Sequence, residues 1–141
     1  MIRREDWPER MDAAISLARR RKFSWGRHDC ALFICDVVEA MTGTDMAYGL
    51  RGRYSDELGA KAIAGELGGA GLRALARFIA SRFGLQEVLP RYARRGDAVL
   101  ARAAIGGRLA FGVCVGAETL IAGPDGLVAI PLERSVKAWR I

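Results

Sequence analysis

The sequence contains few cysteines and a single histidine, and both shortages limit the chemistry that it can support. Its three cysteines, an odd number in a chain of 141 residues, argue against a disulfide-stapled secreted scaffold. A structural zinc site needs four ligands with short paired spacings, whereas His28, Cys30 and Cys35 include no CxxC pair. We therefore expect reduced thiols, no metal site and no cofactor.

Long apolar runs are absent as well. The first ten residues mix acidic and basic side chains and lack the apolar core of a signal peptide, and no later run is long enough to cross a bilayer. With 51% hydrophobic residues, the chain has the size and composition of one domain, residues 1–141, with one core. We expect a protein with neither an export signal nor a membrane span.

Positive charge is plentiful, but it is dispersed. The formal charge of +6 comes from 22 basic and 16 acidic side chains, and 19 of the basic residues are arginine. These arginines lie in short separate groups without interleaved aromatic side chains that could stack on bases. A solvated basic surface is therefore favoured, and a nucleic-acid-binding module stays open as an interpretation that depends on the charge alone.

Hydrophobic periodicity predicts helices in the first part of the chain. Asp6, in the D-x-x-E pattern of a helix start, and Asp29 are the expected caps of the first two helices, and Gly43 is the expected left-handed stop of the second. The second helix is apolar on nearly every face, which is typical of a helix in the middle of a core. The predicted helices span residues 7–21, 30–42, 56–67 and 72–83.

The period of the pattern changes after Gly96. Short β-rich runs follow, separated by a Gly106–Gly107 pair suited to a hairpin and by a Pro-Asp-Gly turn at residues 124–126. We count about five short strands. Helices followed by an antiparallel sheet predict an α+β fold.

Cys30 is the first candidate for chemistry. Free amides and the helix dipole at the first turn of a helix favour a thiolate, so we expect a lowered pKa for this thiol. A nucleophilic cysteine also needs a base, and His28 lies two residues earlier. Side chains two apart on a helix diverge, but a turn could bring them together. Alternatively, Cys30 is a core residue and His28 holds the loop before the helix in place.

Three motifs occur in a telling order. The first is an aromatic-x-Trp-Gly element ahead of Asp-Cys, formed by Phe23, Trp25, Gly26, Asp29 and Cys30. The second is a Gly-Asp-x-Val sequence within residues 96–102, and the third is a β-rich run over residues 110–132. Together they resemble the NlpC-like branch of papain-fold cysteine peptidases, over about half of the chain. The resemblance implies a papain-like core, in which a central cysteine-bearing helix packs on an antiparallel sheet that carries the base.

The chain departs from that family at the positions of the chemistry. The resemblance assigns the catalytic histidine to the position of Ala110 and the third polar residue to that of Ala122. Phe23 stands in place of a tyrosine, and with Trp25 and the two alanines it is expected to form the wall of the site. Asp29 is expected to cap the helix that carries Cys30.

The whole pattern, including Arg-Gly-x-Tyr at 51–54 and the final Ala-Trp-Arg-Ile, is similar to a branch of this superfamily in tailed-phage, prophage and gene-transfer-agent genomes of high-GC bacteria. That similarity implies a structural or adaptor protein of a phage-type tail tip, partnered by other tail proteins, in the virion or in the host cytoplasm during assembly. The alternative is an active cysteine endopeptidase or amidase that cleaves peptidoglycan peptides, with Cys30 as nucleophile and His28 as base.

Overall fold

The computed structural model describes residues 1–103 and 106–141; Ala104 and Ile105, within one predicted β-rich run, lie outside the described residues. The helices are α1 (Trp7–Arg19), α2 (Cys30–Thr42), α3 (Glu57–Gly68) and α4 (Leu72–Phe83), with short 3-10 helices η1 (Pro90–Tyr92) and η2 (Leu132–Arg134). The strands are β1 (Gln86–Val88), β2 (Ala98–Arg102), β3 (Leu109–Cys114), β4 (Glu118–Gly123), β5 (Gly126–Pro131) and β6 (Ser135–Arg140).

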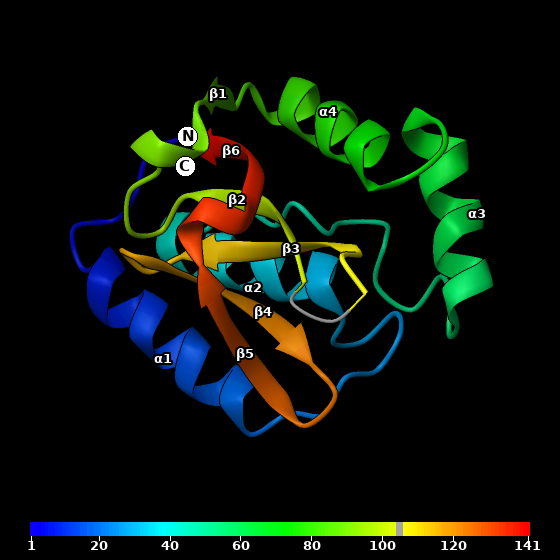
Figure 1. Ribbon diagram of the computed structural model, residues 1–141, viewed down its shortest axis with the longest axis horizontal. Helices are drawn as coiled ribbons and strands as arrows, with labels where there is room; N and C mark the ends of the chain where they lie inside the picture. Colours follow the sequence, from blue (N-terminus) through cyan, green and yellow to red (C-terminus); the bar gives the residue numbers. More distant parts are fainter. Residues whose placement is uncertain (104–105) are drawn as a thin grey trace.

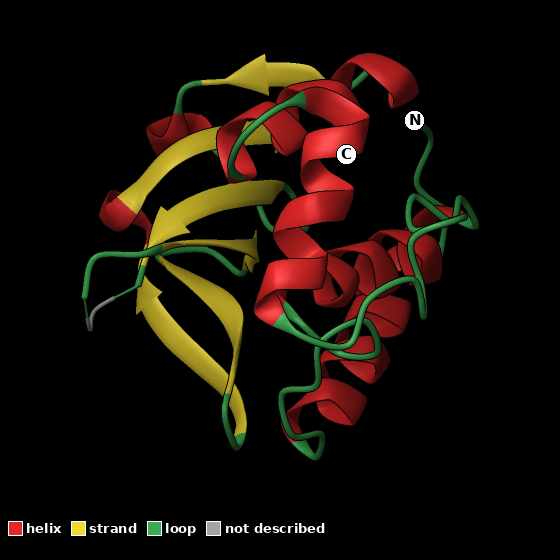
Figure 2. Ribbon diagram, turned by 90° about the vertical axis from the view of Figure 1, so that its right-hand side faces the viewer, coloured by secondary structure: helices red, strands yellow, loops and turns green. Residues whose placement is uncertain are grey.

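The predicted α+β class is confirmed. The strands form an antiparallel sheet in the order β1-β6-β2-β3-β4-β5, with α1 and α2 against one of its faces (Figures 1 and 2). All five strands expected after Gly96 are present. The sixth, β1, pairs with β6 and was not predicted, because a strand of three residues is too short to show a period.

Helix α2 occupies the centre of the molecule, as its sequence predicts. It packs against α1 on one side and against β3 and β4 on the other. Seven of its residues are buried: Leu32, Phe33, Ile34, Cys35, Val37, Val38 and Met41. Cys30, its first residue, therefore lies where the helix meets the sheet.

The two predicted caps have different outcomes. The side chain of Asp29 accepts hydrogen bonds from the amides of Ala31 and Leu32, at 3.1 and 3.0 Å, which confirms it as the cap of α2. The predicted cap at Asp6 is wrong, because its carboxylate makes no capping bond and instead accepts from Arg10, at 2.8 Å. A long arginine one turn later on an exposed face competes successfully for that carboxylate.

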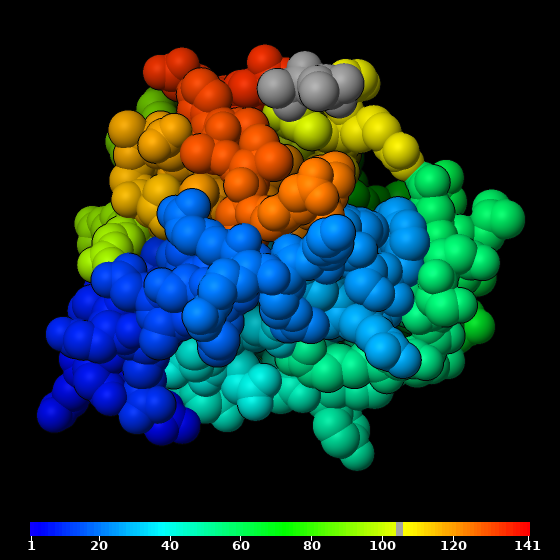
Figure 3. Space-filling model, turned by 90° about the horizontal axis from the view of Figure 1, so that it is seen from below, coloured from blue at the N-terminus to red at the C-terminus, as the bar shows by residue number. Residues whose placement is uncertain are grey.

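The connector from α1 to α2 is held against the sheet. The amide of Phe23 donates to the carbonyl of Pro124 in the β4–β5 turn, at 3.2 Å. In the space-filling view the connector, in lighter blue, lies directly beneath the orange β4–β5 hairpin (Figure 3). Helices α3 and α4 pack mainly on each other, to the side of this body (Figure 1).

Within residues 1–103 and 106–141, the helices are all too short or too polar to reach across a bilayer.

Candidate functional site

A cavity of about 310 Å³ opens at the N-terminus of α2, between the sheet and α3 and α4. All but one of the site residues expected from sequence line it: Phe23, Trp25, Asp29, Cys30, Ala110 and Ala122. Apolar side chains from α3, from α4 and from the loop before α3 complete its wall, among them Leu50, Ile63, Leu72 and Leu75. The fold thus brings together residues that lie almost a hundred positions apart in the sequence.

A closed turn shapes one wall of this cavity. The backbones of Ser24 and His28 exchange two hydrogen bonds, of 2.9 and 2.7 Å, and Gly26 at the turn has a φ of +74°. A Cβ atom on Gly26 would come within 1.9 Å of the carbonyl oxygen of Tyr54, so only glycine fits. The turn presents Trp25 edge-on to the ring of Phe23, with 4.9 Å between ring centroids.

Asp29 joins this turn to the helix and to the following loop. Its buried carboxylate accepts four hydrogen bonds, from the amides of Gly26, Ala31 and Leu32 and from the hydroxyl of Tyr54 at 2.7 Å. Burial and this bond to Asp29 raise the pKa of Tyr54, so its hydroxyl remains a donor. Asp29 is therefore fully occupied by structural contacts, and no lone pair is left for a substrate.

The expected lowering of the Cys30 pKa is wrong. Cys30 as a whole residue is only partly buried, but the atoms packed around its sulfur desolvate the thiol and raise its pKa to about 11, although a hydrogen bond from the backbone amide of Phe111 acts in the opposite direction. The helix terminus cannot offset burial here, because the first free amides of α2 already bind the negative carboxylate of Asp29. At neutral pH the side chain is a thiol.

Alkylation of Cys30 should reflect this raised pKa. In a Cys35→Ala, Cys114→Ala background, we expect iodoacetamide to react at pH 7 roughly a hundredfold more slowly than with an unstructured cysteine peptide, because the thiolate is the reactive form. The rate should climb as the pH rises towards 11. A reaction midpoint at or below pH 8 would contradict the burial of this thiol. For the same reason, the stability that Cys30 contributes is complete below pH 9.0 and declines as the pH approaches 11.

Charged side chains lie at the mouth of the cavity, and they pair with one another. Glu57 at the start of α3 forms an ion pair with Arg108 ahead of β3, and a second with Lys61 at 3.3 Å. The hydrogen bond from Arg108 lowers the pKa of Glu57. Sequence patterns gave no sign of the bridge between Glu57 and Arg108, since it joins segments that are 51 residues apart.

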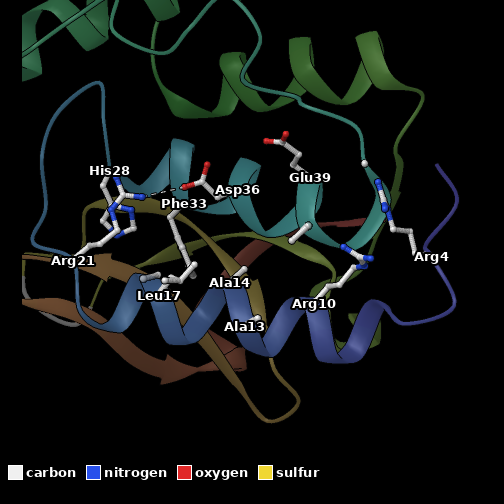
Figure 4. A pocket seen from close by; sticks show the side chains of 13 residues that line it. Arg4, Arg10, Ala13, Ala14, Leu17, Arg21, His28, Phe33, Asp36 and Glu39 are labelled. Carbon is white, nitrogen blue, oxygen red and sulfur yellow. Dashed lines mark ion pairs between the residues drawn. The ribbon is translucent and has the colours of Figure 1, made fainter.

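His28, the remaining residue of the predicted site, lies in a different place. Its side chain is 1% exposed and lines a separate cavity between α1 and α2, beside Arg21 and Phe33 (Figure 4). Neither ring nitrogen has a hydrogen-bond partner among the residues that the structure describes, so no bond joins His28 to Cys30. Burial, followed by the charge of Arg21, lowers the pKa of His28 and keeps the ring neutral.

Replacement of His28 by phenylalanine should change the acid sensitivity of the fold. Because the pKa of His28 falls below 6.5 on folding, its neutral form contributes stability above that pH which is lost as the pH falls through 6.5. Urea unfolding at pH 7 and pH 5 should show a smaller acid loss for His28→Phe than for the wild type. At pH 7 the variant should be at least as stable as the wild type, since it removes buried polar atoms that had no partner. An equal acid loss in both would contradict a buried neutral ring.

No group of three or more histidine, cysteine and acidic side chains gathers in metal-binding geometry within the described part of the chain. The cavity at Cys30 offers one thiol, a carboxylate that is already occupied, and an apolar wall. It is suited to hold an apolar group.

A family model described as a domain of unknown function, DUF6950, matches residues 2–141, so the chain belongs to that family. A search of the curated proteins finds no match to this chain.

Proposed function

We propose that this protein is a non-catalytic relative of papain-fold peptidases, and that it serves as a structural or adaptor component of a phage-type tail tip. One observation carries the proposal: Cys30, Ala110 and Ala122 line the same cavity, and the alanines occupy the positions that the family resemblance assigns to the base and to the third polar residue. On this proposal the protein acts in the virion tail or, during assembly, in the host cytoplasm.

The arrangement of the elements supports a papain-like core. The cysteine lies at the first residue of α2, and this helix packs on β3 and β4 of the antiparallel sheet. The amide of Phe111, next to Ala110 on β3, hydrogen-bonds the Cys30 sulfur. Ala110 packs with Ala101, Ile121 and Ile130 as well as lining the cavity, and a histidine in its place would extend from the strand that contacts the sulfur.

The chemistry of the cavity argues against thiol catalysis. Attack by a cysteine requires a thiolate and a group that accepts the proton. With a pKa of about 11, only roughly one Cys30 in ten thousand is ionised at pH 7. The sole histidine of the chain lines another cavity, and Asp29 and Glu57 are engaged by other donors. What remains is an apolar recess suited to bind a side chain of a neighbouring tail protein.

Installing a base gives a direct test of this arrangement. We expect Ala110→His to raise the rate of Cys30 alkylation at pH 7 at least tenfold, because an adjacent imidazole can take the proton and stabilise the thiolate. The matched control is Ala129→His, at an exposed position of β5, which should leave the rate unchanged. Equal rates in both variants would contradict the placement of Ala110 at the position of the base.

The non-catalytic role has its own test. Purified protein incubated with peptidoglycan fragments should release no product that depends on Cys30, as judged by mass spectrometry against Cys30→Ala. Hydrolysis that the substitution abolishes would overturn the proposal and establish the active peptidase or amidase instead.

The tail role can be tested by genetics in the genome that encodes the protein, under conditions in which phage-like particles are produced. Deletion of the gene should yield particles without complete tail tips by electron microscopy, and both the wild-type gene and Cys30→Ala should restore them. Normal particles after deletion would exclude a role in the tail.

A further inference from the structure

The cavity that receives His28 is larger than the one at Cys30 and has no part in the function proposed above. It is a groove of about 530 Å³ between α1 and α2 (Figure 4), and it shares no lining residue with the Cys30 cavity. Its floor is made of small and apolar side chains: Ala13, Ala14, Leu17, Ala18, Phe33 and Ala40. Charged side chains stand at its two ends and along the edge formed by α2.

His28 at one end of the groove is held at a cost to stability. A buried polar side chain without a hydrogen-bond partner costs about 1–3 kcal/mol, and both nitrogens of this ring lack one among the described residues. Among the described residues, the aromatic ring near it is that of Phe33, with 6.1 Å between the ring centroids. The ring therefore keeps a donor and an acceptor for a group that enters the groove.

The charge of the groove favours an anion. Arg21 stands beside His28, donates a hydrogen bond to the carbonyl of Arg27 at 3.1 Å, and forms a long ion pair with Asp36 at 3.6 Å. Arg4 and Arg10 line the opposite end, where Arg10 is already paired with Asp6 at 2.8 Å and Arg4 supplies the charge that faces the groove.

The acidic residues on the edge do not cancel this charge. Arg51 neutralises Asp36 at 2.7 Å and also reaches Glu39 at 3.5 Å from outside the groove. Positive charge at both ends, with an apolar floor between them, is complementary to a ligand that carries two separated negative groups.

We propose that this groove binds a short acidic segment of a partner protein. One carboxylate of the segment accepts hydrogen bonds from Arg21 and His28, a second pairs with Arg4, and small apolar side chains between them lie on the alanines of α1. Helix α2, with 13 residues, is roughly 20 Å long, and an extended peptide of six residues spans about the same length.

The single histidine makes the test specific. NMR spectra of histidine-labelled protein contain one ring signal, which reports on this groove alone. The probe is acetyl-Glu-Ala-Leu-Ala-Ala-Glu-amide, and its matched control carries glutamine in place of both glutamates. We expect the acidic peptide to move the signal saturably and to raise the measured pKa of His28 by about one, because a carboxylate favours the charged ring. The charged groups that face the ring are Arg21, Asp36 and Asp29, and the peptide adds one acid to them.

Substitutions at the two ends of the groove test the geometry. Arg21→Gln and Arg4→Gln should each weaken binding of the acidic peptide at least fivefold, whereas Arg77→Gln, on the exposed face of α4, removes the same charge elsewhere and should not weaken it. The backbone spectrum of each variant verifies that it is folded.

Four results would overturn the proposal, and three of them concern the peptides and variants. These are no shift of the His28 signal at millimolar peptide, equal binding of the glutamine peptide, or equal weakening by Arg77→Gln, which would indicate attraction to the overall charge. An equal response to sodium acetate at the same carboxylate concentration would also overturn it, since the groove would then be a simple anion site. None of these outcomes bears on the proposal for Cys30, which concerns the other cavity.

Discussion

Replacing Asp97 with alanine should cost about 3 kcal/mol of unfolding free energy, the largest loss that we expect from a single side chain. Asp97 is fully buried, with ion pairs to Arg3 at 2.9 Å and Arg140 at 3.0 Å. Its carboxylate also accepts from the amides of Arg94 and Ile141, at 2.8 and 3.4 Å. Removal of the carboxylate would leave two arginines without their ion-pair partner and two amides without their hydrogen-bond acceptor.

This carboxylate connects both ends of the chain to the sheet. Arg3 also donates to the carbonyl of Ile141 at 2.9 Å, so residues 3, 97 and 141 form one cluster, and the two termini lie side by side (Figure 1). The Asp97→Ala variant should therefore also show faster amide exchange in β6, measured by mass spectrometry.

The control for Asp97 is Asp12→Ala. Asp12 forms an ion pair with Arg95 at 2.6 Å, but its side chain is 64% exposed, so we expect a loss of no more than about 0.5 kcal/mol. Urea unfolding of the three proteins would decide between them. A loss under 1 kcal/mol for Asp97→Ala would mean that this cluster positions the chain termini but does not stabilise the fold.

Asp29→Ala should have the second-largest effect, a loss of about 2–3 kcal/mol, which combines the removal of a helix cap with buried donors left unsatisfied. The four hydrogen bonds that Asp29 accepts come from donors in the turn at Gly26, the first turn of α2 and the loop at Tyr54. Because these segments form one wall of the Cys30 cavity, the substitution should also make Cys30 easier to alkylate.

Two controls separate the parts of this effect. Asp56→Ala removes the exposed cap of α3, which makes one hydrogen bond to Gly59 at 2.7 Å, and should cost about 1 kcal/mol. Tyr54→Phe removes only one of the four bonds to Asp29, and a double-mutant cycle with Asp29→Ala would measure their coupling. If Asp29→Ala lowers the free energy of unfolding no more than Asp56→Ala does, the role of Asp29 is limited to capping α2.

The helical part of the fold could be predicted because its signals are local. α2 begins at Cys30 and ends before Gly43, with a φ of +82°, as its cap, apolar faces and glycine indicate. α1 ends at Arg19, two residues before the predicted end at residue 21. The bond between Asp6 and Arg10 that overrides the predicted cap is also local, but two competing uses of one carboxylate cannot be ranked from sequence.

The candidate site could be predicted only in part. The family resemblance gave the residues of the cavity wall, and the fold brings them together. In the sequence, Tyr54 belongs to an Arg-Gly-x-Tyr pattern that does not indicate a partner for its hydroxyl. Its hydrogen bond to Asp29 forms between residues that are 25 positions apart. Glu57 and Lys61 have the i,i+4 spacing of a helix-surface pair, but the link from Glu57 to Arg108 carried no signal, since ion pairs between distant segments have no sequence period.

The sequence by itself determined the α+β class, the buried helix that Cys30 begins, and the supply of one histidine and three thiols. The tertiary structure decided what those groups can do. His28 and Cys30 are two residues apart in the chain, but a closed turn directs them into different cavities, where burial raises the pKa of the thiol and lowers that of the imidazole. Proximity along a chain does not fix the direction of a side chain or its exposure to water, and both shifts depend on these two properties.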